Sequence, residues 1–145
     1  MPGHLRSTLT LLSCVFAVAL AAPAQASPTE MERRLVERIN DVRDSYGLRK
    51  LRIGSTLADG AHDWSRHLLR RDSFHHSRLR AGTGEVLAWG TCSWFRPRRA
   101  VRMWLDSPGH RALLLRPGFR SVGTGWTRGA WRDYGCAEMA VARFR

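Results

Sequence analysis

The chain is poor in lysine, in acidic residues and in long apolar runs. Lys50 is the only lysine among 24 basic residues, and 12 acidic residues leave a formal charge of +12 over 145 residues. Beyond the N-terminus no apolar run reaches the roughly 18 residues that a membrane-spanning helix needs, which excludes a polytopic membrane protein. Because 43% of the residues are hydrophobic, a disordered chain is excluded as well. We expect one compact domain with a hydrophobic core.

Local signatures of the common enzyme and metal sites are also missing. The sequence has no Gly-rich phosphate loop, no HExxH, no paired CxxC and no GxSxG nucleophile elbow. No recognised nucleic-acid motif is present, so specific nucleic-acid binding is not expected. The excess of arginine nevertheless favours anionic partners for an exported protein, the alternative being a dispersed, solvated surface.

The N-terminal segment has the pattern of a secretory signal. The apolar run from Leu9 to Ala21 is too short to span a bilayer comfortably, and Ala24-Gln25-Ala26 supplies a small-x-small cleavage pattern. We predict a signal peptide over residues 1–26, a mature domain over 27–145, secretion, and no transmembrane segment after cleavage. An uncleaved anchor is the alternative.

Two cysteines remain in the predicted mature chain. An even pair in an exported domain predicts one disulfide between Cys92 and Cys136. The alternative is two buried free thiols.

Apolar periodicity predicts four helices followed by strands. Met31, Leu35, Ile39, Val42 and Tyr46 recur at helical spacing, and further helices are expected from a Ser55 cap to about residue 71, from Pro97, and from Ser107-Pro108. From residue 120 the period changes to two, with a turn near 128–129 and a last strand over about 133–144. This order indicates an α+β fold with helices packed on a small antiparallel sheet.

Three segments concentrate groups that can bind ligands or transfer protons, at residues 74–77, 84–89 and 104–110. Their candidates are His76, Glu85, Asp106 and His110. Imidazole nitrogens and a carboxylate oxygen that met in a cleft could hold a divalent cation such as zinc, or position a water. Ordinary solvated or capping roles are the alternative.

The same segments resemble the CAP superfamily of cysteine-rich secretory, antigen 5 and pathogenesis-related proteins, and especially its bacterial SCP-like extracellular branch. The resemblance covers nearly all of residues 31–144 and is carried by Ile39-Asn40, Arg43, Gly47-Leu48, Leu51, Leu57-Ala58, Ala61, His76-Ser77, Gly84-Glu85, Trp104, Ser107-Pro108-Gly109-His110, Val122-Gly123 and Gly125. It implies an α-β-α sandwich with a three-stranded antiparallel sheet.

The resemblance also implies a cleft with two histidines and two acidic residues, which in some relatives holds a divalent cation. His76, Glu85 and His110 match three of these positions and are the predicted metal ligands, with no cofactor strictly required. The second acid is unmatched, because Ser107 stands near its place with Asp106 beside it.

The resulting functional expectation is a monomeric extracellular module that binds a lipid, a cell-envelope component or another anionic polymer through the His/Glu cleft. Arginines near both histidine segments would make its rim positive: Arg66, Arg70, Arg71, Arg78, Arg80, Arg96, Arg98, Arg99, Arg102 and Arg111. The alternative is a hydrolase, metal-dependent or serine-type, that uses His76, Glu85 and His110, with Ser77 and Ser107 beside the histidines as nucleophile candidates.

Overall fold

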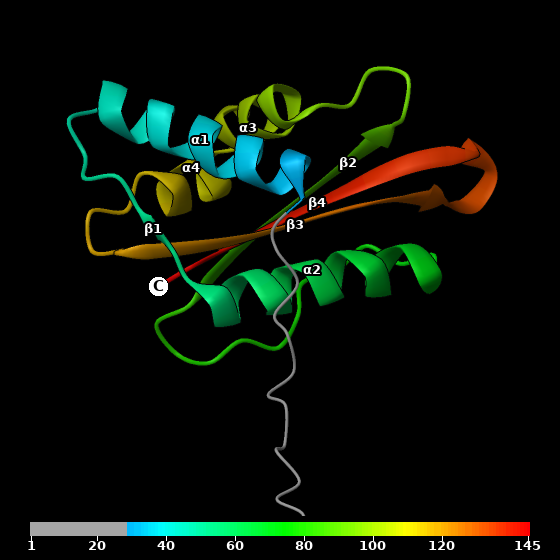
Figure 1. The fold of residues 1–145 in the computed structure, drawn as a ribbon, viewed down its shortest axis with the longest axis horizontal. Coiled ribbons are helices and arrows are strands. Elements are labelled where there is room, and N and C mark those ends of the chain that lie inside the picture. The colour runs from blue at the N-terminus through cyan, green and yellow to red at the C-terminus, as the bar shows by residue number, and fades with distance from the viewer. Residues whose placement is uncertain (1–28) are drawn as a thin grey trace, which may run out of the picture.

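A computed structural model describes residues 29–145 as four α-helices, a short 3-10 helix and a four-stranded sheet (Figure 1). The elements are α1 (Glu30–Ser45), β1 (Arg52–Ile53), α2 (Ser55–Arg70), β2 (Gly84–Thr91), α3 (Pro97–Asp106), α4 (Pro108–Leu114), β3 (Ser121–Ala130), η1 (Arg132–Tyr134) and β4 (Cys136–Phe144). The predicted signal peptide lies outside the described residues. No helix among them combines the length and apolarity needed to cross a bilayer.

The helices begin close to the predicted positions. Thr29 caps α1 in a reciprocal capping box with Glu32, and Pro97 and Pro108 occupy the first turns of α3 and α4. One cap differs from the prediction: the N-cap of α2 is Gly54, and Ser55 is already helical. The reason is that Gly54 also donates its N–H to the carbonyl of Val122, which ties the start of α2 to the sheet.

The sheet has the order β1-β3-β4-β2 and is mixed. Strands β2 and β3 each pair antiparallel with β4, which lies between them, as the predicted three-stranded sheet requires. The fourth strand corrects that prediction. Two residues of the linker before α2, Arg52 and Ile53, pair in parallel with the start of β3.

One further expectation about the strands was wrong, and one strand was not predicted at all. Strand β3 continues through residues 128–129, where a turn was expected, and the chain turns only at 131–135 around η1. Strand β2 was not predicted as a strand. Its first five residues are all buried, so the segment lacks the alternation of an exposed strand and its apolar run fits either type of element.

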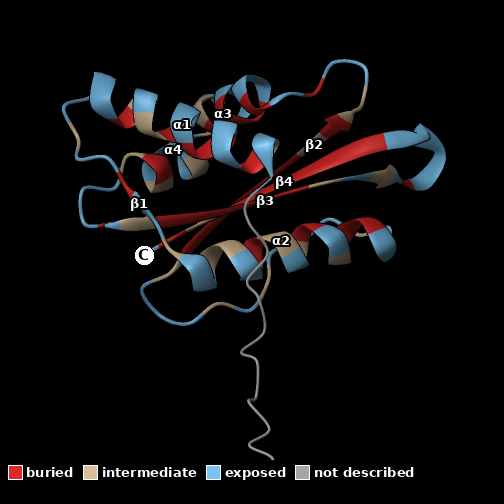
Figure 2. Ribbon diagram, viewed as in Figure 1, coloured by how far each residue is buried: buried red, intermediate tan, exposed pale blue. Residues whose placement is uncertain are grey.

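Helices cover both faces of the sheet, which confirms the sandwich. Helices α1, α3 and α4 lie on one face and α2 on the other (Figure 1), and the buried residues gather along the sheet and the inward helix faces (Figure 2). Helix α2 approaches β3 closely because Gly123 and Gly125 carry no side chain. A Cβ atom at Gly125 would lie 2.2 Å from the carbonyl oxygen of Ala61.

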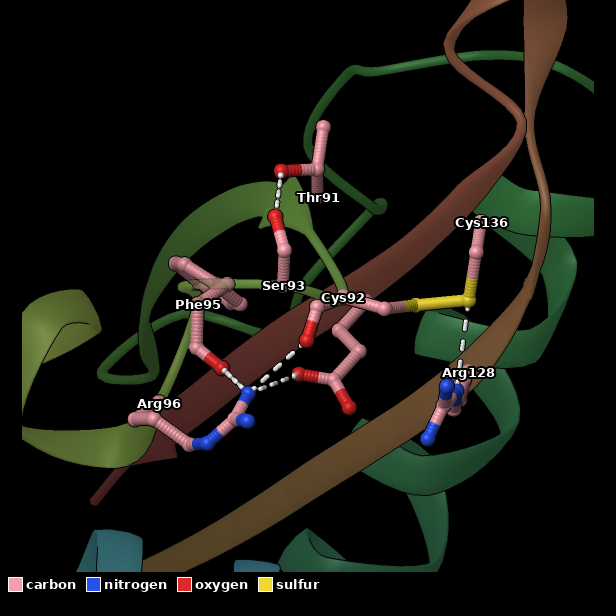
Figure 3. The surroundings of a disulfide bond; sticks show 8 residues. Thr91, Cys92, Ser93, Phe95, Arg96, Arg128 and Cys136 are labelled. Carbon is pink, nitrogen blue, oxygen red and sulfur yellow. Dashed lines mark hydrogen bonds and ion pairs between the residues drawn. A yellow bond between two sulfur atoms is a disulfide. The ribbon is translucent and has the colours of Figure 1, made fainter.

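The predicted disulfide is confirmed. Cys92 and Cys136 are bonded at 2.05 Å (Figure 3), and the N–H of Cys92 also donates to the carbonyl of Cys136. The bond joins the residue after β2 to the first residue of β4. It therefore fixes the end of the β2–β4 pair that lies farthest from Glu85 along β2.

Candidate functional site

Glu85 is the buried centre of the predicted site. It is the second residue of β2, and Arg143 lies directly opposite it on β4. Only 1% of the Glu85 side chain is exposed, and the Nε of Arg143 donates to its Oε2 at 2.9 Å. Opposite charges that face each other across two strands stabilise the pair, and here the pairing keeps a buried carboxylate from being left uncompensated.

The loop between α2 and β2 supplies the remaining bonds to Glu85. The backbone N–H of Ser77 donates to Oε1 at 2.8 Å, and the Ser77 hydroxyl donates to Oε2 at 2.6 Å. The Nδ1 of His76 lies 3.0 Å from Oε1. Arg143 closes the network by donating from Nη2 to the Ser77 hydroxyl at 3.0 Å. Both carboxylate oxygens are thus fully engaged inside the protein.

These contacts fix the charge of Glu85. Burial by itself raises the pKa of a carboxyl group, but the hydrogen bonds from Ser77, Arg143 and His76 outweigh burial and hold the pKa of Glu85 below its ordinary value. An ionised carboxylate can only accept hydrogen bonds. In the hydrogen bond between His76 and Glu85 the proton is therefore carried by Nδ1 of His76. The other ring nitrogen, Nε2, is then left for a ligand or a reacting group.

Helix α2 makes room for Arg143 at a glycine. A Cβ atom at Gly60 would lie 2.3 Å from Nη1 of Arg143. A glycine in the middle of a helix costs about 1 kcal/mol relative to alanine, and here it opens the space in which the guanidinium reaches Glu85. Gly60 therefore acts on the site through Arg143.

His110 approaches His76 from the other face of the fold. The two rings lie 6.4 Å apart between centroids and at 61° to each other, and 55% of the His76 side chain is exposed. Burial, and secondarily the nearby charge of His76, lower the pKa of His110. His110 is therefore neutral at physiological pH and can either donate or accept a hydrogen bond.

The position of His110 depends on a buried arginine. Arg43 of α1 is fully buried and donates from Nη1 to the carbonyls of Leu114 and Arg116, at 2.7 and 3.1 Å. These carbonyls lie at the C-terminus of α4, where a cation is favourable. On the other side, the indole N–H of Trp104 in α3 donates to the carbonyl of Leu87 in β2 at 2.9 Å. Helices α3 and α4 are thereby held against the strand that carries Glu85.

The structure brings His76, Glu85 and His110 to one place but leaves the other candidates apart. Asp106 is exposed at the end of α3, and its carboxylate makes no hydrogen bond or ion pair with another described residue. The Ser77 hydroxyl is held between Glu85 and Arg143, so it is not free to act as a nucleophile.

The donor set does not fit a resident divalent cation. Within residues 29–145 no three His, Cys, Asp or Glu side chains are arranged to share a metal ion. The oxygens of Glu85 are used by His76, Ser77 and Arg143. The two imidazoles alone fall short of the three or four protein ligands of zinc sites.

Some of the predicted basic rim lies elsewhere. Arg98 and Arg102 line a hollow of about 220 Å³ between α1 and α3, while Arg66 and Arg70 line one of about 230 Å³ between α2 and β3. Arg78, Arg80 and Arg111 are exposed and follow the two site histidines closely in the sequence.

Sequence reasoning missed Arg143, Gly60 and a second carboxylate–imidazole pair. Glu32 of α1 is buried, and its Oε1 accepts from the backbone N–H of Trp126 and contacts Nδ1 of His62 at 2.7 Å. Because α1 and α2 lie on opposite faces of the sheet, the Glu32–His62 pair links the two helices across the edge of β3 that faces away from β4. The one local signal in the sequence for Glu32 is its place three residues after Thr29, which is the spacing of a capping box.

Comparison with known proteins gives a consistent assignment. The profile of CAP, the "Cysteine-rich secretory protein family", matches residues 36–143. The uncharacterized protein YkwD of Bacillus subtilis is 29% identical over 118 residues, which are 71% of this chain and 45% of YkwD. The chain thus spans less than half the length of this curated relative.

Solved structures show the same fold. An outer surface protein from Borrelia burgdorferi matches with a TM-score of 0.64 at 23% identity, over 82% of this chain and 94% of that one. An extracellular protein containing a SCP domain from Bacillus anthracis matches with a TM-score of 0.63 at 22% identity, over 78% of this chain and 39% of that one.

Proposed function

Because the chain belongs to the CAP family of cysteine-rich secretory proteins, we propose that it works outside the cell as a binding domain for an anionic lipid or cell-envelope ligand. His76 and His110 form the recognition site, and the anionic group of the ligand, such as a phosphate, lies between their rings.

The observation that carries this proposal is the orientation of His76 by Glu85. A buried, ionised carboxylate holds Nδ1 of His76 inward at 3.0 Å, while 55% of the side chain is exposed. The ring is thus fixed before a ligand arrives, and little conformational entropy is lost on binding. When Nε2 is protonated, it becomes a charged donor aimed away from Glu85, and charged donors make the stronger hydrogen bonds to oxyanions.

The charge around the site supports an anionic ligand. The formal charge of the chain is +12, and Arg78, Arg80 and Arg111 are exposed close in sequence to the two histidines. Exposed guanidinium groups attract phosphate groups over a distance of about 8 Å at physiological ionic strength. Since imidazolium is the better anion donor, affinity is expected to rise as the pH falls through the lowered pKa of His110.

The test is binding of the disulfide-bonded protein to vesicles that contain phosphatidylglycerol, with vesicles of phosphatidylcholine alone as the neutral control. A soluble glycerol phosphate polymer in a parallel assay distinguishes an envelope polymer from a membrane. We expect the double variant H76A/H110A to bind about 100-fold more weakly, because two hydrogen bonds to a charged group together contribute about 3 kcal/mol or more. The matched control is H75A, because His75 is an exposed neighbour with no contact to Glu85. Equal binding by the double variant and the wild type would refute the proposal.

The same orientation favours one second candidate, a hydrolase. A histidine whose Nδ1 is held by a carboxylate has the arrangement of a general base. Because the Ser77 hydroxyl is held by Glu85 and Arg143, the nucleophile would be a water activated by Nε2 of His76. Turnover of nitrophenyl esters or phosphodiesters that falls by about 10²-fold or more in H76A, with ligand binding retained in H110A, would favour this candidate over the binding domain.

A further inference from the structure

A second hollow on the molecule is not used by the proposed function. It has a volume of about 230 Å³ and lies between the C-terminal half of α2 and the outer edge of β3. We call it the β3-edge groove. Its lining consists of Arg66, Leu69 and Arg70 from α2, and Thr127, Arg128, Gly129 and Ala130 from β3.

The strand that forms one wall of the groove has an open edge. Strand β1 pairs only with Ser121 and Val122 of β3. The outward carbonyl of Val122 accepts from Gly54, and farther along the strand the outward N–H of Trp126 donates to the side chain of Glu32. Because successive residues of a strand alternate in direction, Arg128 also turns its N–H and C=O outward.

Ala130 lies two residues further on and shares this direction. The outward groups of Arg128 and Ala130 have no hydrogen-bond partner within residues 29–145. Exposed strand edges of this kind are templates for pairing with another extended chain.

The helix that forms the other wall carries unpaired positive charge. Arg66 and Arg70 are both exposed and stand one turn apart, where like charges repel. Neither forms an ion pair with a described carboxylate, and no acidic residue lines the groove. In the hollow between α1 and α3, by contrast, Arg38 is paired with Asp41 at 3.3 Å.

Arg128 and Leu69 contribute to the groove in different ways. The guanidinium of Arg128 turns away toward the disulfide and donates to the sulfur of Cys136 at 3.2 Å (Figure 3). Arg128 therefore presents its backbone to the groove. Buried Leu69 supplies an apolar floor between the two arginines of α2.

From these features we infer that the β3-edge groove binds an extended acidic peptide. The peptide adds a strand beside residues 128–130 of β3 and places carboxylates against Arg66 and Arg70. A strand fits better than a free oxyanion, because the edge offers both donors and acceptors and an oxyanion can only accept. A second copy of this chain fits poorly, because edge-to-edge pairing would bring two Arg66–Arg70 pairs together on molecules that each carry +12.

The test uses a fluorescently labelled peptide of alternating glutamate and valine, with a lysine and valine peptide of equal length as control. Fluorescence polarisation at low salt should show saturable binding of the acidic peptide alone. The variant R66E/R70E should weaken binding at least tenfold. The matched control is R98E/R102E, which reverses an equally spaced pair of α3 that lines the other hollow and should change affinity by less than about twofold.

Strand addition itself is tested at the backbone. The variant A130P removes the outward N–H of Ala130 and leaves the pairing of β3 with β4 in place, since proline is tolerated at outward edge positions. It should abolish binding. Hydrogen exchange in the wild-type protein should also show slower exchange at the amides of Arg128 and Ala130 when the peptide is bound.

The outcomes separate this inference from the proposed function. The variant H76A/H110A should bind the peptide as the wild type does. Equal loss in R98E/R102E and R66E/R70E, unprotected amides at 128 and 130, or no saturable binding of the acidic peptide would each overturn the inference, whatever the vesicle experiment shows.

Discussion

Replacing Arg143 by methionine should destabilise the protein more than removing any exposed arginine. Methionine keeps most of the apolar stem but removes both bonds that the guanidinium makes, to Glu85 at 2.9 Å and to Ser77 at 3.0 Å. The arginine side chain is 14% exposed and that of Glu85 only 1%. The change therefore leaves a carboxylate inside the protein without its countercharge.

Removing one partner of a buried ion pair costs about 3 to 5 kcal/mol. Glu85 keeps its bonds from His76 and Ser77, so we expect the lower end, about 3 kcal/mol at pH 7. For a domain of this size that corresponds to a fall in Tm of roughly 10 °C. The control is R98M, because Arg98 is exposed and makes no ion pair with a described residue. It should change the stability by no more than about 0.5 kcal/mol.

The pH dependence gives a second readout that simple loss of packing would not produce. Hydrogen bonds hold the folded pKa of Glu85 below its ordinary value, against the effect of burial. Its contribution to stability is therefore complete above the unfolded pKa and is lost as the pH falls through the folded one. In R143M the folded pKa rises, so the difference from the wild type should be largest near neutral pH and shrink in acid.

Urea denaturation between about pH 3 and pH 7, with the disulfide intact, measures both quantities. If R143M is as stable as R98M, or if the difference in free energy of unfolding is the same at both ends of that range, the reasoning about Glu85 and Arg143 is wrong.

Three further results are expected. Gly125→Ala should cost about 3 kcal/mol or more, because its Cβ would meet backbone atoms of α2 at 2.2 Å; a urea midpoint equal to that of the wild type would contradict the close approach. Replacing Cys92 and Cys136 by serine opens a loop with a sequence separation of 44 residues and should cost about 4 kcal/mol; a urea midpoint of the serine variant equal to that of the disulfide-bonded wild type would contradict this. By NMR, the pKa of His110 should lie below its ordinary value, and His76→Ala should raise it by removing a nearby charge while burial remains; an unchanged pKa of His110 in His76→Ala would contradict the proximity of the two rings.

The helices could be predicted because their signals are local. Apolar residues at steps of three and four, a capping residue and a proline in the first turn lie within a few positions of one another. Strand β2 escaped prediction because its first five residues are all buried, so no polar face alternates with an apolar one. The turn expected at residues 128–129 was wrong because Gly129 lies within β3, where its Cβ position is 3.7 Å from Leu69 of α2.

The central residues of the candidate site could be predicted from the sequence, but the contacts that position them could not. Motifs in the sequence named His76, Glu85 and His110, but the role of Glu85 depends on contacts that no local pattern encodes. Arg143 is 58 residues away in sequence and reaches Glu85 only through the pairing of β2 with β4. The role of Gly60 likewise depends on the guanidinium of Arg143 beside it, which no local pattern in the sequence places there.

The central place of β4 in the sheet has a consequence for the order of folding. The chain delivers β2 and β3 first, yet neither pairs with the other, and each needs β4 between them. A chain that emerges from its N-terminus therefore cannot close its main ladders until the last strand has arrived. If the predicted signal directs export, the polypeptide remains unfolded while it passes through a translocation channel, and it folds and forms the Cys92–Cys136 disulfide only on the far side of the membrane.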